Sequence, residues 1–575
     1  MARAFRHSHN PEIKTMVNLA SKKIGDVLLL ANAVVFVVLL NTLSGYFYLR
    51  VDLTEEKRFT IKQQTKDILN TLDDEINIDV YLQGDLNPGF ERFRKAILET
   101  LEEFRVQSGN KVHYTFVDPA MASGQQAQSE FMAELAAKGI QPTNVIENRN
   151  GQRVEKLIFP GAVISYGSAE TGVMLLKGNK ARTPDEEINQ SIEGIEYELI
   201  NAIYKLVTID HKRVGLSVGH GELDSVDIAA LHSALLELYD VLPVEVGHDD
   251  LAGFDVVIVP KPRYIFSPVD KYKLDQYIMN GGSVLFLLDR LEATMDSASA
   301  ENYFAFPYNT GLDDQLFKYG VRINPDLIQD LSSSRYPVIT GDAGGKPQMQ
   351  LMDWPFFPLI NRFADHPATR NLDAVILKFA SSIDTVKAQG IRKTPLMFTS
   401  QYSRTIETPV RVNVNDIRRN PGREEFVKSF VPLGYLLEGK FSSLFKNRFL
   451  PEGIEKTTFR DEGEPAKIIV IADGDLAANV VNLRTGQPQP LGFDPFTKYT
   501  FANRDLLLNA VAYLADENGL INTRNKEVKI RPLDREKVND EKVKWQIINV
   551  ALPVLIVILY GILRSYLRRR SFSRF

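Results

Sequence analysis

Two long apolar runs, one near each end of the chain, most strongly limit how this sequence can fold. They span Val27 to Leu49 and Trp545 to Leu563, and neither contains a charged residue. At about 1.5 Å per residue, helices of these lengths cross most or all of a hydrocarbon core about 30 Å thick. A cleavable signal peptide, the alternative for the first run, usually has an apolar region of only about 7 to 15 residues. We therefore predict two transmembrane helices, at residues 27–49 and 545–563.

Basic residues indicate how these spans are oriented. Segments rich in Lys and Arg stay on the cytoplasmic side of a membrane. The tails at residues 1–26 and 564–575 are such segments, whereas the flanks at 50–58 and 534–544 mix acids with bases. We therefore expect both tails to be cytoplasmic and residues 50–544 to lie on the other side. The basic residues are Arg3, Arg6, Lys14, Lys22 and Lys23 before the first span, and Arg564, Arg568, Arg569, Arg570 and Arg574 after the second.

Composition excludes several classes of function. The net charge of -5 is small for 575 residues, and no long basic run lies between the spans, so we expect no nucleic-acid partner. The chain has no cysteine, which excludes disulfides, a thiolate nucleophile and sulfur-ligated metal sites. At roughly 150 residues per domain, the length predicts three or four folded units.

The residues after the first span predict a small α/β domain, residues 50–208. The strand pattern of Ile76–Leu82, the helical pattern of Phe90–Gln107 and the strand pattern of Lys111–Pro119 form a β-α-β unit, which implies a parallel strand pair. Two strand-like stretches follow, and a helical pattern over Glu186–Leu206 closes the domain. This order indicates a thioredoxin-like fold, but without Cys-x-x-Cys the domain cannot carry out thiol chemistry.

Strand and helix patterns alternate in the second unit, residues 209–525. Val214–Val218 and the stretches FDVVIVPKP, SVLFLLD and AKIIVIADGD are strand-like, with helical patterns among them. Such alternation predicts a doubly wound parallel sheet. Residues 298–394 are richer in Pro, Asn, Asp and Gly and predict an insertion, and residues 526–544 form a juxtamembrane linker. The predicted fold class is therefore a two-span α/β membrane protein with two α/β units between its spans.

The stretch GYLLEGKFSS, residues 434–443, differs by one residue from the phosphate-binding loop G-x-x-x-x-G-K-[ST]. In that loop the Ser or Thr supplies a magnesium ligand, but Phe441 takes its place. The intervening Tyr435, Leu436 and Leu437 favour a strand over a turn, and the carboxylate of Glu438 would repel phosphate. We therefore predict a strand without nucleotide, and we expect no cofactor.

Two turns supply candidate ligand or partner residues. His220 and Glu222 in GHGE follow a predicted parallel strand, where ligands commonly bind in such sheets. For this turn, catalysis or metal binding, non-catalytic ligand or partner binding, and a structural role stay open. Asp473 and Asp475 in IIVIADGD can hold a cation or cap the following helix, and capping is the preferred interpretation. Neither H-x-x-x-H nor a nucleophile and base accompanies these residues, so we predict no catalytic or metal site.

Several stretches, by their order and spacing, give the sequence a family resemblance. They are RVDLTEEKRFTI after the first span, INIDVYL, VGLSVGHGE, FDVVIVPKP, GGSVLFLLD, LLEGKFSSLF, IIVIADGDLAANVVN, and NKEVKIRPLDREKV before the second span. Over almost its whole length the chain resembles the GldG family, the gliding motility-associated components of uncharacterised ABC-type transport systems.

The resemblance implies an auxiliary, substrate-binding subunit in the inner membrane of a Bacteroidetes envelope. Its implied partners are a multi-span permease like GldF, a cytoplasmic ATPase like GldA, envelope components and membrane lipid. Residues 50–544 would then be periplasmic. The second unit would belong to the GIFT domain class, shared with an intraflagellar transport protein and akin to amidotransferase folds. An amidotransferase needs a cysteine nucleophile, and this chain has none.

Two classes of function follow. The preferred one is a non-enzymatic subunit that packs on a permease and relays ATP-driven movement to its extracytoplasmic region. The alternative is an outward-facing hydrolase or carbohydrate-binding protein that uses the GHGE turn.

Overall fold

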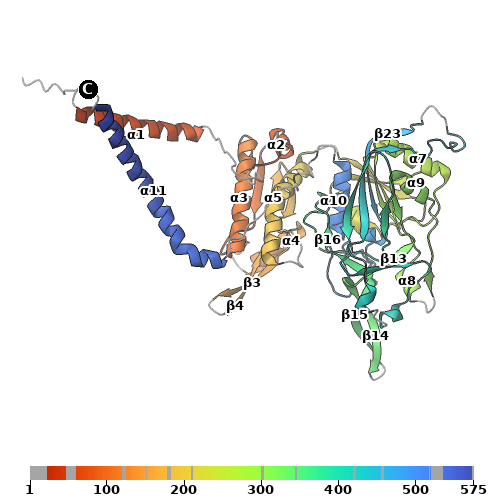
Figure 1. Cartoon of the computed structure of the whole chain (residues 1–575). Coiled ribbons are helices and arrows are strands. Elements are labelled where there is room, and N and C mark those ends of the chain that lie inside the picture. The colour runs from red at the N-terminus through yellow and green to blue at the C-terminus, as the bar shows by residue number, and fades with distance from the viewer. Residues whose placement is uncertain are drawn as a thin grey trace, which may run out of the picture. The chain divides into compact units, whose positions relative to one another are not determined.

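The protein is described from a computed structural model (Figure 1). Its chain divides into two units, Met1–Phe59 and Thr60–Phe575, each treated by itself. The last residues of the first predicted span, 47–49, and the first part of the predicted linker, 526–534, lie outside the described residues. The described residues are 22–46, 60–119, 125–149, 152–177, 183–208, 211–299, 303–343, 346–418, 422–454, 459–516, 519, 523 and 535–572.

Both predicted spans contain a helix. In the first unit, α1 runs over Lys22–Tyr46 and holds a shorter apolar stretch, Val27–Thr42. In the second unit, α11 runs over Arg535–Phe572, and its segment Asp540–Leu567 is long and apolar enough to cross a membrane. The apolar side chains of both helices are exposed, as suits helices whose partners are lipid or other proteins.

A four-stranded sheet follows α1 in the chain. Its order is β2-β1-β5-β6, with β1 parallel to β2 and antiparallel to β5, and β5 antiparallel to β6. The predicted β-α-β unit and its parallel pair are therefore confirmed. The strands are β1 Ile76–Val80, β2 Val112–Phe116, β5 Gly161–Tyr166 and β6 Ala169–Met174, and β3 Thr143–Arg149 pairs with β4 Gln152–Ile158 in a separate hairpin.

Helices α3 and α5 lie side by side against this sheet (Figure 1). In α3, Pro88–Gln107, buried apolar residues recur every three or four positions, which gives the helix one core-facing stripe. In α5, Pro184–Val207, a capping box between Thr183 and Glu186 satisfies the first backbone amides. Two shorter helices belong to the same region, α2 Gln63–Asn70 and α4 Gln125–Ala137.

A larger sheet of eight strands has the order β16-β19-β22-β23-β10-β9-β7-β8. Its half from β23 to β8 is parallel, as predicted, but β22, β19 and β16 pair antiparallel. The predicted doubly wound parallel sheet is therefore a mixed sheet. The reason is that parallel neighbours need a crossover, whereas β22 and β23 are joined without a helix on the sheet. The strands are β7 Arg213–Val218, β8 Asp240–Glu245, β9 Val256–Pro260, β10 Ser283–Leu287, β16 Arg362–Phe363, β19 Ile391–Phe398, β22 Pro432–Ser442 and β23 Glu462–Ile471.

Helices cover both faces of this sheet. Alternate strand residues such as Val256 and Ile258 pack with α6, Ala229–Leu236, and α10, Asn503–Ala515. The intervening residues, such as Val257, belong to a second core with α7 Pro268–Met279 and α9 Asp313–Tyr319. A parallel sheet buried on both faces explains why its strands are apolar without alternation.

Most of the predicted insertion forms short strands around a third core, centred on the buried Trp354. The hairpin of β14 and β15 extends outward from this region (Figure 1). The elements are α8 Met295–Ala298, β11 Phe304–Ala305, β12 Val321–Ile323, β13 Asp326–Asp330, β14 Ser333–Ala343, β15 Lys346–Ile360, β17 Val375–Ile376, β18 Ile383–Thr385, β20 Ser403–Glu407 and β21 Val410–Arg411.

Candidate functional site

Two charged clusters lie at one edge of the large sheet. Strands β7, β9, β10 and β23 are parallel neighbours, so their carboxyl ends meet at the same edge, where open α/β sheets bind ligands. The first cluster, which we call the histidine bridge, consists of His220, Glu222 and Asp270. The second, the lysine–aspartate cluster, consists of Lys261 after β9, Asp289 after β10, and Asp473 and Asp475 after β23.

The histidine bridge holds an imidazole between two carboxylates. His220 Nε2 lies 3.1 Å from Asp270 Oδ2, and Nδ1 lies 3.5 Å from Glu222 Oε1. The backbone N–H of His220 donates to Glu222 Oε2 at 2.6 Å, and the ring stacks on Phe266 with centroids 3.7 Å apart. The predicted pair His220 and Glu222 is thus brought together, and His220 is only 8% exposed.

The electrostatics favour a charged imidazole in this bridge. Burial lowers the pKa of His220, but its contacts with Glu222 and Asp270 outweigh burial and raise the pKa above its ordinary value. Burial raises the pKa of Glu222 and of Asp270, yet the contact with His220 and further hydrogen bonds hold both below their usual values. Because Asp270 also forms a capping box with Ser267, the bridge ties the GHGE turn to the start of α7.

The lysine–aspartate cluster packs one ammonium against three carboxylates. Lys261 Nζ lies 3.0 Å from Asp289 Oδ2 and also pairs with Asp475. Oxygens of Asp289, Asp473 and Asp475 all lie within 4.8 Å of one another. Lys261 is 2% exposed, Asp289 6% and Asp473 0%, so the cluster is almost wholly removed from water.

The preferred interpretation of Asp473 and Asp475 as helix caps is wrong. The short 3-10 helix after them, η6, covers Asp475–Ala477, and its N-cap is Gly474 without a side-chain hydrogen bond. Asp475 instead pairs with Lys261, and Asp473 Oδ2 accepts the backbone N–H of Lys378 at 2.6 Å. The lysine competes successfully because an ion pair with a buried ammonium is worth more than one exposed cap.

Burial shifts the pKa values of the groups in this cluster. Burial raises the pKa of Asp473 well above its usual value, and the neighbouring Asp289 and Asp475 raise it further. Burial also raises the pKa of Asp289, against the opposing effect of Lys261. Lys261 itself stays charged, since burial lowers its pKa but the carboxylates of Asp289 and Asp475 more than offset this.

Sequence reasoning missed Asp270, Lys261 and Asp289. Lys261 and Asp289 each follow an apolar strand almost directly, which is the same signal that singled out Asp473. Asp270 lies 50 positions from His220 and carried only the signature of a helix start, Ser267 followed three residues later by an acid. Nothing in that pattern indicates a histidine partner.

The phosphate-loop lookalike is a strand, as predicted. Residues 434–443 belong largely to β22, which pairs with β19 on one side and β23 on the other. Its backbone amides therefore bond to neighbouring strands and do not form a cradle for phosphate. Phe441, at the position of the magnesium ligand, is fully buried.

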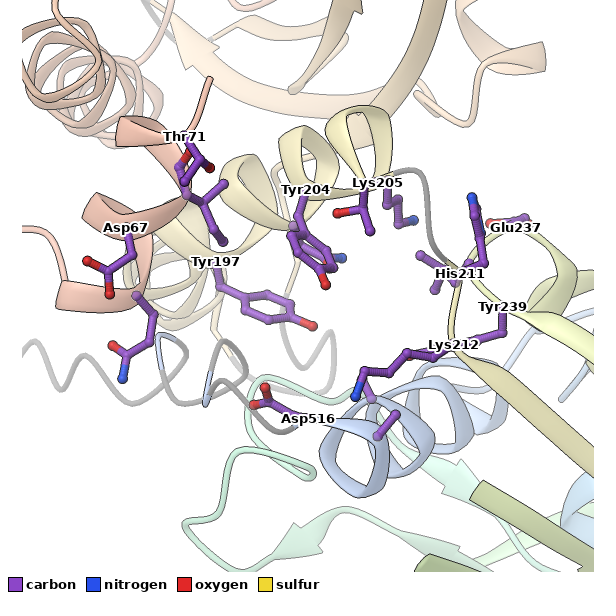
Figure 2. A pocket seen from close by; sticks show the side chains of 17 residues that line it. Asp67, Thr71, Tyr197, Tyr204, Lys205, His211, Lys212, Glu237, Tyr239 and Asp516 are labelled. Carbon is purple, nitrogen blue, oxygen red and sulfur yellow. The ribbon is translucent and has the colours of Figure 1, made fainter. Parts of the chain in front are cut away.

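A cavity of about 450 Å³ lies away from the sheet edge (Figure 2). It is bordered by α2, by α5 and by residues near the start of the large sheet. Figure 2 shows the rings of Tyr197, Tyr204 and Tyr239 around it, with the amino group of Lys205 nearby. Burial lowers the pKa of Lys205. The volume of the cavity falls within the range of small-molecule pockets, although none of the candidate residues predicted from the sequence lines it.

Comparison with known families decides the assignment. A family model described as an ABC-type uncharacterized transport system matches residues 211–510. The chain belongs to this family of ABC transport auxiliary proteins. A model of a domain of unknown function matches residues 55–165. An uncharacterized protein of Borreliella burgdorferi is 24% identical over 555 residues, which cover 94% of this chain and 97% of that protein.

Two solved structures are similar to this chain. The N-terminal domain of mmIFT52 gives a TM-score of 0.30 at 13% identity, over 53% of this chain and 97% of that one. An exo-β-1,4-mannosidase from Opitutaceae bacterium strain TAV5 gives a TM-score of 0.19 at 10% identity, over 51% of this chain and 35% of that one. At these TM-scores neither similarity carries an argument about function.

Proposed function

We propose that the chain is a non-enzymatic, GldG-like auxiliary subunit that couples a permease and a cytoplasmic ATPase to a periplasmic region. The single observation that carries this proposal is the family match over residues 211–510. The relative from Borreliella burgdorferi supports it, because the similarity extends over nearly all of both chains. The connection to gliding motility rests on the resemblance of the sequence to the GldG family.

The proposed topology is two spans of the inner membrane with both termini in the cytoplasm. The exposed apolar surfaces of α1 and α11 support two anchors, and the basic tails support the orientation. In α1, the hydroxyl of Thr42 donates within its own helix to the backbone carbonyls of Val38 and Leu39. The side-chain amide of Asn32 also needs hydrogen-bond partners, and lipid tails offer none. We propose that the Asn32 face of α1 packs on the permease.

The arrangement of strands supports the proposed domain types. The order β2-β1-β5-β6 with one parallel pair agrees with a thioredoxin-like domain within residues 50–208. The parallel half of the large sheet agrees with a GIFT-type domain within residues 209–525, with its insertion at 298–394. Neither domain contains a cysteine. We therefore propose binding and force transmission for the periplasmic region.

The geometry of the GHGE turn argues against the hydrolase alternative. Both nitrogens of His220 face carboxylates, so the imidazole serves to join β7 to α7. The nearby hydroxyl of Ser217 donates to Glu222 at 2.8 Å, and Ser217 is 1% exposed. A nucleophile needs both a base within hydrogen-bond reach and access to substrate. Ser217 has a carboxylate in reach, but it is buried and lacks that access.

Copurification tests the proposal. The tagged full-length chain, extracted from its own membranes in mild detergent, is expected to bring down a multi-span permease and an ATPase in fixed ratio. Asn32→Leu should weaken this association, while the matched Thr42→Val, whose hydroxyl bonds only within α1, should leave it unchanged. A folded chain that purifies alone, or a sugar-hydrolysing activity that His220→Ala abolishes, would contradict the proposal.

A further inference from the structure

The lysine–aspartate cluster has more negative charge than its own lysine can balance. One ammonium faces three carboxylates, so two negative charges lack a counter-charge within the cluster when all four groups are ionised. Asp289 and Asp473 are buried, and the side chain of Asp475 is 18% exposed. Burying uncompensated charge is costly, so this arrangement calls for a further cation or for protonation of a carboxylate.

Two oxygens of the cluster, Asp289 Oδ2 and Asp473 Oδ1, are buried without a hydrogen bond among the described residues, and only the first of them has an ion pair. Asp473 Oδ2 accepts the N–H of Lys378, but Oδ1 accepts no hydrogen bond, and the residue is 0% exposed. Asp289 differs, because its Oδ1 accepts the N–H of Gly474 at 2.6 Å and its Oδ2 faces Lys261. A buried carboxylate oxygen without a donor is costly unless a cation or a proton occupies the space beside it.

The carboxylates suit a divalent cation that binds oxygen ligands. One oxygen from each carboxylate lies within 4.8 Å of the others, so a single ion can reach all three. Ca²⁺ accepts irregular sets of oxygen ligands at about 2.3–2.6 Å, whereas Mg²⁺ requires near-octahedral geometry at about 2.0–2.1 Å. Because Lys261 already pairs with two of the three carboxylates, the remaining set is irregular and suits Ca²⁺ better. The donor set contains only oxygen, which favours Ca²⁺ or Mg²⁺ over zinc or copper. A divalent ion would also balance the two excess charges.

We propose that Asp289, Asp473 and Asp475 bind one divalent cation, preferably Ca²⁺, at the carboxyl edge of the large sheet, with Lys261 as a fixed second cation in the cluster. The partly exposed Asp475 provides the side from which the ion enters. Such a site would fasten the ends of β10 and β23 together and make the stability of this edge depend on calcium. The proposal goes beyond the assigned family and does not depend on any transport partner.

Thermal unfolding of the full-length protein in detergent tests this site. Chelator-treated protein is titrated with CaCl₂, and unfolding is followed by the change in fluorescence of its two tryptophans, of which Trp354 is buried in the fold and Trp545 is exposed. We expect the Tm to rise by on the order of 3 °C at saturation, with a smaller rise for MgCl₂. Asp473→Asn should abolish the rise, and it should unfold no earlier than the parent without calcium, because it removes an excess buried charge.

A second variant and a matched control keep the test specific. Asp475→Asn, at the exposed side of the site, should also lose the calcium response. Asp330→Asn changes another fully buried carboxylate, one whose oxygens accept hydrogen bonds from Ser332 and Ser400, and it should keep the response even if it unfolds earlier. No response of the parent to calcium would overturn the site and indicate that protons balance the charge. A response that persists in both cluster variants would place the ion elsewhere and overturn it equally.

Discussion

The histidine bridge and the lysine–aspartate cluster lie at the same edge of one sheet, but they compensate charge differently. In the bridge, one imidazolium faces two carboxylates, and Asp270 lies at the first turn of α7, where the helix dipole stabilises negative charge. Glu222 also accepts hydrogen bonds from Ser217 and from the backbone of His220. Every carboxylate of the bridge therefore has donors.

The cluster lacks such compensation. Its three carboxylates share one lysine, and one oxygen of Asp473 has no donor among the described residues. The comparison teaches that the position at a strand end does not by itself identify a site. What separates a structural bridge from a site for a ligand is whether each buried charge has an opposite charge beside it. His220 Nδ1 makes no hydrogen bond, but it lies 3.5 Å from Glu222 Oε1, whereas Asp473 forms no ion pair among the described residues.

Removing the lysine should have the largest effect. Lys261→Met leaves Asp289 and Asp475 without their ammonium, next to the buried Asp473, and we expect the free energy of unfolding to fall by about 3–5 kcal/mol. The measurement is denaturant unfolding of the full-length protein. As a control, Lys271→Met removes a partner of the half-exposed Asp314 and should cost about 1 kcal/mol or less. Equal losses of stability in the two variants would mean that Lys261 contributes no more to the fold than the lysine of a partly exposed ion pair.

Crowding the backbone beside the cluster should have the next largest effect. A Cβ at Gly474 would lie 2.6 Å from Lys261 Cβ and 3.0 Å from Lys261 Cα, so the two strand ends could not keep their approach. We expect Gly474→Ala to destabilise by about 1–3 kcal/mol. The control is Gly341→Ala, whose nearest neighbour is Gln348 Oε1 at 3.6 Å. Its stability should stay within about 1 kcal/mol of the parent.

The histidine bridge should make the stability of the fold depend on pH. Since its folded pKa is raised, the proton on His220 stabilises the fold fully below the unfolded pKa of about 6.5 and stops doing so as pH rises through the folded value. Glu222 and Asp270 stay ionised over this window because their pKa values are lowered. His220→Gln should therefore cost about 1–3 kcal/mol at pH 6 and less at pH 9.

Tm measured from pH 6 to pH 9 checks this dependence. The exposed His248 provides the control, because His248→Gln should leave the pH profile unchanged. A constant difference between the parent and His220→Gln across the range would show that the bridge carries no extra proton.

An exposed ion pair should have the smallest effect. Arg322 and Asp384 lie 3.1 Å apart with side chains 57% and 58% exposed, so water and salt screen their attraction. We expect Arg322→Ala to lower the free energy of unfolding by less than about 1 kcal/mol, measured by the same denaturant titration. A loss as large as that of His220→Gln would break the distinction between buried and exposed charge on which the comparison depends.

Local patterns predicted much of the fold. Apolar strands such as β9 and β10, and amphipathic helices such as α3, can be recognised from the pattern of a few consecutive residues. The strand identity of residues 434–443 was likewise readable from Tyr435 to Leu437. The antiparallel half of the large sheet was missed, because strand direction depends on how the chain reaches each strand, and the residues of β19 and β22 do not reveal that path.

The clusters were only half predictable for a similar reason. His220 and Glu222 are two residues apart, and so are Asp473 and Asp475, so each pair is visible in the sequence. Their partners are not: Lys261 pairs with Asp475 across 214 positions. Only the order of the strands in the folded sheet brings such residues together, and a single sequence does not give that order.

The central claim is that the region between α1 and α11 lies across the membrane from the ATPase that it serves. The absence of cysteine allows a direct measurement with single introduced thiols. Leu483→Cys, at a fully exposed position, and Ser573→Cys, in the basic C-terminal tail, are treated with a membrane-impermeant maleimide in spheroplasts. The account predicts that Leu483→Cys is labelled in intact spheroplasts and Ser573→Cys only after lysis. Labelling of Leu483→Cys only after lysis would contradict it.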